Sequence, residues 1–253
     1  MVREILYGRQ PVRECLRARR RTFYRLVLAE GVRNSGIVAE LVHLAGALSV
    51  PVQEVSRGQL DRLKAIHQGV ALEASGYPYV SLESILEHVR QSGEAPFLLA
   101  LDHVQDVHNL GALLRSAEAV GVHGVIIPER RAACVTPAVV STSAGASEHM
   151  RVAQVVNLVR CLEALKALGV WIVGLDNCPT ARAYDQVDLA IPLVLLVGAE
   201  GEGLSQLARR SCDLLIRLPM RGQIGSLNAS VAGGVALYAV LAARRRQAEV
   251  TYS

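Results

Sequence analysis

The sequence predicts an α/β protein in which a C-terminal domain holds a parallel β-sheet and a small N-terminal domain is also α/β. From Phe97 onward, near-continuous apolar runs of strand length alternate with helical patterns, as is typical of a parallel sheet covered on both faces. The first third instead carries short strands and amphipathic helices, and the Gly76–Tyr79 stretch then breaks the periodicity. We therefore expect domains at 1–76 and 96–253, joined by a linker at 77–95.

The elements expected in the N-terminal domain alternate between helix and strand. An apolar stripe of Val12, Cys15 and Leu16 predicts a helix over Pro11–Arg20. A second amphipathic pattern predicts a helix over Ile37–Leu48. The other expected elements are strands at Phe23–Ala29, Pro51–Val55 and Val70–Ala74 and a short helix at Gln59–Ile66.

The C-terminal domain is expected to contain six strands with helices between them. The strands are Phe97–Leu101, Gly124–Ile127, Val152–Val156, Val170–Leu175, Leu193–Val197 and Leu214–Leu218, and the helices lie near 110–120, 137–146, 157–168 and 203–210. A short helix is also expected within the linker, before Pro96. The last helix runs from about Leu227 to Arg246, and its small residues provide a face for close packing, as against another subunit.

Positive charge is concentrated in the first third of the chain. Residues 1–76 carry 12 Lys and Arg against 7 Asp and Glu, whereas residues 77–253 carry 15 against 16. Such a concentration predicts a polyanionic partner, although a solvated helix face accounts for the charge equally well. The RNA-binding candidates are Arg9, Arg13, Arg17, Arg20 and Arg21.

Several classes of protein are disfavoured by what the sequence lacks. No apolar run reaches the ~20 residues of a membrane span, and the start resembles no signal peptide, so we expect a soluble cytoplasmic protein with no membrane partner. The five cysteines form no C-x-x-C pair and are expected to be free, mostly buried thiols. The histidines have no ligand spacing, and we expect no metal.

Three apolar strands end in loops of glycine and small polar residues. They read LDHVQDVHNLGALLRSAEAVGV (101–122), LVLLVGAEGEGLS (193–205) and LIRLPMRGQIGSLNASVAGG (215–234). Loops of this kind bring bare backbone close to a ligand, which suggests one shared pocket. Because carboxylates repel phosphate, Glu200 and Glu202 make GAEGEG a poor phosphate cradle and favour a neutral or cationic ligand.

Together these segments resemble the motif set of the SpoU-type (TrmH-like) RNA ribose 2'-O-methyltransferases of the SPOUT superfamily. The matching residues are Asn109, Gly111, Arg115, Glu118, Gly198, Glu200, Gly201, Gly203, Leu218, Pro219, Met220, Gly222, Ser226, Leu227, Asn228 and Ser230. Val107, Gly225 and Ala229 depart from the family pattern, which often has proline, serine and valine there. The resemblance implies a deep trefoil knot, S-adenosyl-L-methionine as methyl donor and a homodimer whose pocket the partner completes.

The resemblance also assigns roles to residues. It implies that Gly198, Leu218, Met220 and Leu227 bind the cofactor and that Asn109, Arg115, Glu200, Ser226 and Asn228 are catalytic. The family's matching arginine is a proposed general base, and this role stays open for Arg115. Because a guanidinium resists deprotonation, we expect Arg115 instead to clamp the target phosphate and orient the 2'-hydroxyl. Glu200 could hold Arg115 or a backbone amide, and Ser226 and Asn228 could equally cap a helix.

The N-terminal pattern and its GRQPVRECL start resemble the L30e-like RNA-binding domain of the family's ribosomal RNA branch. The implied activity is 2'-O-methylation of a guanosine ribose in 23S rRNA. Three alternatives stay open: a tRNA guanosine 2'-O-methyltransferase, a resistance methyltransferase for an adenosine in the same rRNA, and a catalytically inactive RNA-binding scaffold.

Overall fold

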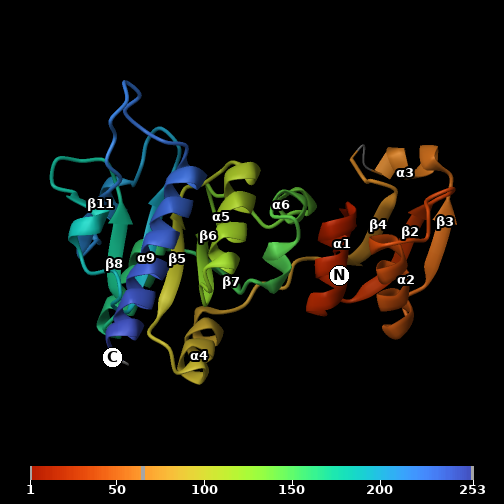
Figure 1. Cartoon of the computed structure of the whole chain (residues 1–253), viewed down its shortest axis with the longest axis horizontal. Coiled ribbons are helices and arrows are strands. Elements are labelled where there is room, and N and C mark those ends of the chain that lie inside the picture. Colours follow the sequence, from red (N-terminus) through yellow and green to blue (C-terminus); the bar gives the residue numbers. More distant parts are fainter. Residues whose placement is uncertain (1, 64–65, 252–253) are drawn as a thin grey trace. The chain divides into compact units, whose positions relative to one another are not determined.

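The computed structural model describes residues 2–63 and 66–251, in which strands and helices alternate along the chain (Figure 1). The chain divides into two compact units. The first unit consists of Met1–Pro78 and Val135–His149, and the second of Tyr79–Cys134 and Met150–Ser253. The predicted α/β class is confirmed for both.

The first unit is built on a four-stranded sheet of order β1-β4-β2-β3, in which β4 is antiparallel to β1 and β2, and β2 is parallel to β3. Its buried side chains include Leu6, Leu16, Leu26, Leu41 and Leu72. The elements are β1 (Arg3–Tyr7), α1 (Arg9–Ala18), β2 (Phe23–Ala29), α2 (Ile37–Ala47), β3 (Val52–Val55), α3 (Arg57–Leu63), β4 (Val70–Ser75), α6 (Pro137–Thr142) and the 3-10 helix η1 (Ala146–His149).

Two elements of this unit differ from the sequence prediction. Strand β1 was not predicted, because its five residues, REILY, are few and mix charged with apolar side chains. The strand is defined by its antiparallel pairing with β4. Helix α3 begins at Arg57 rather than Gln59; the predicted continuation crosses residues 64–65, which lie outside the described part, and Ile66 is not helical.

The helix predicted near 137–146 was assigned to the C-terminal domain, but the segment that contains it, 135–149, packs in the first unit. There α6 contacts β1, and η1 contacts α1. Gly145 permits this close approach, since a Cβ there would lie 2.7 Å from the Cβ of Glu14, and its φ is +90°. The predicted 137–146 helix is therefore wrong in extent, and no local pattern could have indicated its distant packing partner.

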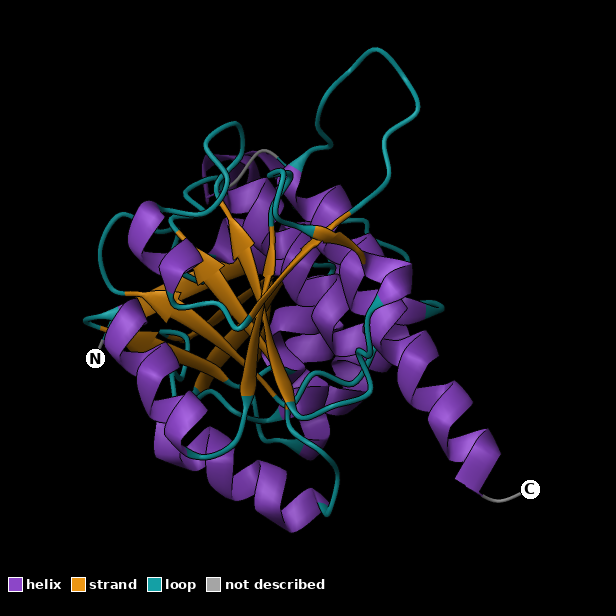
Figure 2. Cartoon of the chain, turned by 90° about the vertical axis from the view of Figure 1, so that its left-hand side faces the viewer, coloured by secondary structure: helices purple, strands orange, loops and turns teal. Residues whose placement is uncertain are grey.

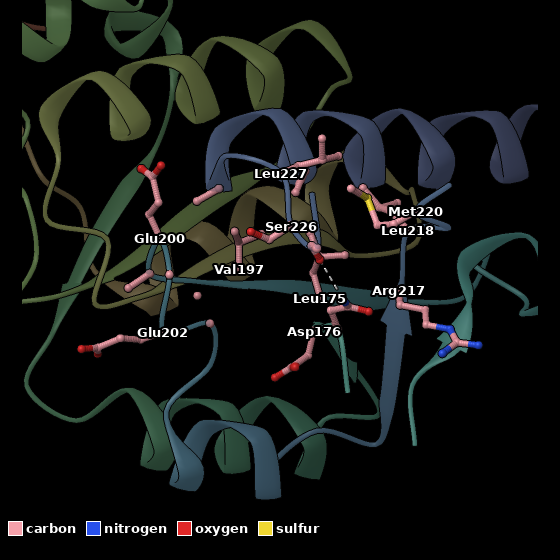
Figure 3. Close-up of a pocket in the computed structure, with 18 residues that line it drawn as sticks. Leu175, Asp176, Val197, Glu200, Glu202, Arg217, Leu218, Met220, Ser226 and Leu227 are labelled. Atoms are coloured by element: carbon pink, nitrogen blue, oxygen red, sulfur yellow. Dashed lines mark hydrogen bonds between the residues drawn. The ribbon is translucent and has the colours of Figure 1, made fainter. Parts of the chain in front are cut away.

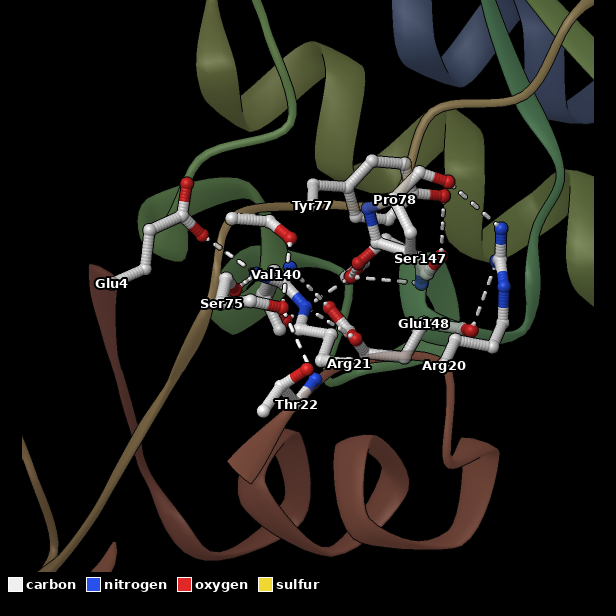
Figure 4. Close-up of polar contacts among 12 residues, drawn as sticks. Glu4, Arg20, Arg21, Thr22, Ser75, Tyr77, Pro78, Val140, Ser147 and Glu148 are labelled. Atoms are coloured by element: carbon white, nitrogen blue, oxygen red, sulfur yellow. Dashed lines mark hydrogen bonds and ion pairs between the residues drawn. The ribbon is translucent and has the colours of Figure 1, made fainter. Parts of the chain in front are cut away.

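A buried ion-pair network fastens this segment (Figure 4). The Arg21 guanidinium has no exposed side-chain surface and donates to both carboxylate oxygens of Glu148, at 2.9 and 2.7 Å. It also donates to Glu4 at 2.7 Å and to the carbonyl of Ser75 at 2.8 Å. The Tyr77 hydroxyl donates to the Ser147 carbonyl at 3.0 Å. The predicted RNA contact of Arg21 is therefore wrong for this conformation, because its guanidinium is enclosed.

The second unit contains a seven-stranded sheet of order β7-β6-β5-β10-β8-β11-β9, with parallel pairing between every two neighbours. Figure 2 shows the strands fanning with the twist of a parallel sheet. The elements are α4 (Leu82–Ser92), β5 (Phe97–Asp102), α5 (Val107–Ala119), β6 (Gly124–Pro128), β7 (Val152–Val155), α7 (Leu158–Ala167), β8 (Trp171–Leu175), β9 (Arg182–Ala183), the 3-10 helix η2 (Tyr184–Gln186), β10 (Leu193–Gly198), α8 (Gln206–Arg210), β11 (Leu214–Arg217) and α9 (Ala229–Thr251).

Helices cover both faces of this sheet, which explains the unbroken apolar strands. Helices α4, α7 and α8 share one core cluster with Leu98, Ala100 and Leu196, whereas α5 and α9 pack side by side over the other face (Figure 1). The helix expected in the linker is α4, and it is part of this core, with Ile85 fully buried. The parallel sheet is as predicted; the trefoil knot stays a prediction.

Candidate active site

Three strands of the second unit, β8, β10 and β11, deliver their carboxyl ends to one cavity, the usual position of ligand sites in parallel sheets. The cavity has a volume of about 320 Å³ (Figure 3). Its walls come from the end of β8, the loop after β10, the loop after β11 and the first turns of α9. Two of the three glycine-bearing segments therefore meet here, as the sequence predicted.

The loop after β10 is a tight hairpin that requires glycine. A Cβ on Gly198 would lie 2.2 Å from the carbonyl carbon and oxygen of Gly203. Ala199 and Gly203 exchange two backbone hydrogen bonds, at 3.1 and 3.0 Å. Gly201 and Gly203 have φ of +81° and +68°, a region that other residues adopt only with strain. The hairpin exposes backbone to the cavity and carries the exposed carboxylate of Glu200.

The Glu200 carboxylate joins all three segments. Its Oε2 accepts a hydrogen bond from Asn109 Nδ2 at 2.9 Å and another from Asn228 Nδ2 at 3.1 Å. Asn109 lies in the first turn of α5, whose N-cap is Asp106. Among the described residues, the hydrogen-bond partners of Glu200 are thus two neutral amides, rather than Arg115 or a backbone amide.

Asn228 combines helix capping with a contact at the site, two roles that the sequence does not make mutually exclusive. Its Oδ1 accepts from the backbone of Ser230 at 3.0 Å and of Val231 at 3.3 Å, which caps α9. Its Nδ2 faces Glu200 at the same time. Ser226 lies in the loop and lines the cavity.

Arg115 lies apart from this cluster. It follows Asn109 by six residues, about 240° around the helix, so it occupies a different face of α5. The side chain is exposed, does not line the cavity, and has no hydrogen-bond or ion-pair partner among the residues the structure describes. Arg115 is therefore not brought to the site within one chain.

All four predicted cofactor-binding residues, Gly198, Leu218, Met220 and Leu227, line the cavity. Sequence reasoning missed the wall formed by Leu175, Asp176 and Asn177. The pattern was visible, since Asp-Asn follows the apolar strand β8, but the loop that begins there (176–181) has no glycine, unlike the three segments identified from the sequence. Asp176 is held by Arg209 Nε at 2.8 Å, with its carboxylate 8% exposed.

The cavity can accept a cationic ligand with an apolar part. Leucine and methionine side chains form one wall, the glycine hairpin offers backbone donors and acceptors, and carboxylates of Asp176, Glu200 and Glu202 lie at the rim or wall. S-adenosylmethionine fits this donor set, because its sulfonium is cationic and its adenine needs backbone partners. Among the described residues no three His, Cys, Asp or Glu side chains gather as a metal site.

A second cavity, of about 760 Å³, lies along α5, α9 and η2. Its α9 side carries Val231, Val235 and Tyr238, which are 52%, 42% and 53% exposed. Ala112 and Ser116 of α5 also line this second cavity, and Arg115 lies between them in the sequence. We call this surface the α5–α9 face.

In the first unit, most of the predicted RNA-binding arginines are engaged by protein groups. Arg13 and Arg17 pair with Glu14 and Glu40. Arg20 donates to the carbonyls of Glu148 and Pro78, both at 3.2 Å. Arg9 donates to the Gln68 carbonyl at 3.2 Å. The charge that the sequence counts is therefore partly neutralised on α1, while the exposed Arg19, Arg33, Arg57 and Arg62 have no ion-pair partner among the described residues.

The cysteines are free, as predicted, but only Cys15 and Cys161 are buried. Burial, reinforced by Asp213 and Asp176, raises the pKa of the Cys212 thiol to about 12. Burial also raises the pKa of Cys161 to about 11. Cys134 is exposed, so the expectation of mostly buried thiols is wrong. Over residues 2–63 and 66–251, no helix combines the length and the apolar character needed to span a membrane.

Comparison with known proteins agrees with this geometry. The profile of the SpoU rRNA Methylase family matches residues 96–238, and that of the RNA 2'-O ribose methyltransferase substrate-binding domain matches residues 5–80. A Bacillus subtilis protein named as a TrmH family tRNA/rRNA methyltransferase, YacO, is 40% identical over 94% of both chains.

Solved structures extend the comparison. An AdoMet-bound rRNA methyltransferase from Sinorhizobium meliloti is 26% identical, with a TM-score of 0.78 over 96% of this chain and 87% of that one. The SpoU methyltransferase AviRb from Streptomyces viridochromogenes, solved with AdoMet, has the same fold, with a TM-score of 0.80 at 23% identity over 96% of this chain and 91% of that one. The chain belongs to the SpoU (TrmH-like) family of S-adenosylmethionine-dependent RNA 2'-O-methyltransferases.

Proposed function

We propose that this enzyme methylates the ribose 2'-hydroxyl of a guanosine in 23S rRNA. The observation that carries the catalytic part is the Glu200 cluster: one carboxylate fixes Asn109 and Asn228 beside a cavity lined by Gly198, Leu218, Met220 and Leu227. The ribosomal RNA substrate is supported by the match of the first unit to a substrate-binding domain and by the S. meliloti relative, which is named an rRNA methyltransferase.

The chain's own residues supply position and charge in this mechanism. Bound in this cavity, S-adenosylmethionine would supply a methyl group that its cationic sulfur activates for transfer to a ribose 2'-oxygen. The glycine hairpin and the loop after β11 hold the donor, and the uncompensated charge of Glu200 favours a cation nearby. Asn109, Asn228 and Ser226 orient the acceptor, because in-line transfer depends on alignment.

The exposed position of Arg115 supports a homodimeric site. The α5–α9 face presents Val231, Val235 and Tyr238 to solvent, and exposed apolar patches commonly mark protein interfaces. A second copy on this face would place Arg115 at the interface, where it could clamp the target phosphate in the other copy's pocket. Tyr238→Glu should convert the dimer to a monomer in sedimentation analysis and abolish turnover; a wild-type monomer with full activity contradicts the dimer.

Labelled S-adenosylmethionine and total RNA test the substrate. The purified enzyme should label 23S rRNA, and mapping should find one guanosine 2'-O-methyl. Label found in tRNA, or on an adenosine, would show that the proposed substrate is wrong, whereas ribose 2'-O-methylation would still hold. Calorimetric binding of S-adenosylmethionine without transfer to any RNA identifies a scaffold instead. We also propose that the protein is cytoplasmic and that its C-terminal domain contains a trefoil knot.

A further inference from the structure

We infer that Asn177 is a positioning residue that sets the loop after β11 against the cofactor cavity. This inference rests on the proposed function of the cavity, but it concerns a residue outside the three family motifs. Asn177 lies just past the end of β8, and its Nδ2 donates a hydrogen bond of 2.9 Å to the carbonyl of Gly225.

The loop that Asn177 holds is long and exposed. Residues 218–228 form no helix or strand, and 221–228 are all exposed. In the part of the chain that the structure describes, the bond from Asn177 is the one hydrogen bond that residues 218–227 make. Yet Leu218, Met220, Ser226 and Leu227 of this loop line the cavity. One contact therefore fixes much of the pocket wall.

The other end of this contact is rigid. The preceding residue, Asp176, is 8% exposed at its carboxylate and is bound by Arg209 Nε at 2.8 Å. Its backbone N–H donates to the Ile216 carbonyl of β11 at 2.9 Å. Asn177 thus donates its side-chain amide from a well-anchored position at the end of β8, and this hydrogen bond sets the position of the loop after β11. A loop that is already ordered loses less conformational entropy when S-adenosylmethionine binds. The hydrogen bond from Asn177 should therefore raise the affinity for S-adenosylmethionine rather than the rate of methyl transfer.

The first test uses trypsin without cofactor. Arg221 lies in the loop, and cleavage after it, followed by mass spectrometry, reports loop opening. Asn177→Ala and the same-sized Asn177→Asp, which cannot donate, should both accelerate this cleavage roughly two- to fivefold, the effect of one exposed neutral hydrogen bond. Thr180→Val is the matched control, because Thr180 lies in the same connection and its hydroxyl contacts Cys178, not the loop. Equal cleavage rates in all four proteins overturn the inference.

The second test is kinetic. Asn177→Ala should raise the KM for S-adenosylmethionine roughly two- to fivefold and leave kcat within about twofold, with the melting temperature unchanged. A fall in kcat and stability with constant KM would indicate a general structural role and contradict the inference. If the wild type binds no S-adenosylmethionine, the proposed function fails, whereas the trypsin comparison still decides whether Asn177 holds the loop.

Discussion

Glu148 and Glu200 are both bound by side chains from distant segments, but their surroundings differ. Glu148, in the first unit, is 1% exposed and faces the fully enclosed guanidinium of Arg21, so its charge is cancelled. Glu200, in the second unit, is exposed beside a cavity, and its hydrogen-bond partners among the described residues are two neutral amides. The comparison teaches that a paired, buried carboxylate serves the fold, whereas an uncompensated carboxylate beside a cavity serves a ligand.

The largest expected effect is on the buried pair. Glu148→Ala removes the carboxylate that pairs with both Nε and Nη2 of Arg21. The enclosed charge is left with Glu4, the Ser75 carbonyl and the Tyr77 ring, and the first unit should be destabilised by about 3 kcal/mol. Far-UV circular dichroism should show the first unit unfolding at a lower urea concentration in the variant than in the wild type. Trp171, the one tryptophan, lies in β8 of the second unit, and its fluorescence transition should stay in place. A shift of both transitions by the same amount contradicts an effect confined to the first unit.

The same change at the cavity should affect catalysis rather than stability. Glu200→Ala frees the amides of Asn109 and Asn228, and misalignment of this kind costs about a hundredfold in kcat/KM. Since Glu200 is exposed, the free energy of unfolding should change by less than about 0.5 kcal/mol. Glu202→Ala, in the same hairpin but without an asparagine partner among the described residues, should lose less activity. Equal losses in the two variants would remove the special role of Glu200.

The comparison extends to arginines. Arg115→Lys should reduce turnover about tenfold with little change in RNA binding, because lysine keeps the charge but loses the two-pronged geometry that clamps a phosphate. Arg21→Lys should instead lower the stability of the first unit. Single-turnover methylation and filter binding separate these outcomes, and a parallel loss of RNA affinity and turnover in Arg115→Lys would contradict a role in orientation.

The sequence predicted local features well and charge pairing poorly. The strands of the second unit are apolar on both faces, so their hydrophobic pattern alone located them, and glycine loops located most of the cavity. The partners of Arg21 and Glu200 lie 127 and 91 residues away, and no local pattern encodes such distances. For the same reason an arginine count could not distinguish Arg21, which is enclosed, from Arg33, which is exposed.

The smallest expected effect concerns an exposed pairing on the first unit's sheet. A hydrogen bond from Arg3 is the main cause that lowers the pKa of Glu73 below its ordinary 4.5; burial opposes it, and a hydrogen bond from Arg25 adds to the lowering. A lowered folded-state pKa stabilises the fold above about pH 4.5, and this contribution is lost as the pH falls through the folded value. Glu73→Gln should therefore cost less than about 1 kcal/mol at pH 7, and this cost should be smaller at pH 3. Urea unfolding at both pH values measures the difference; a cost that does not depend on pH would show that Glu73 acts through packing, unlike either Glu148 or Glu200.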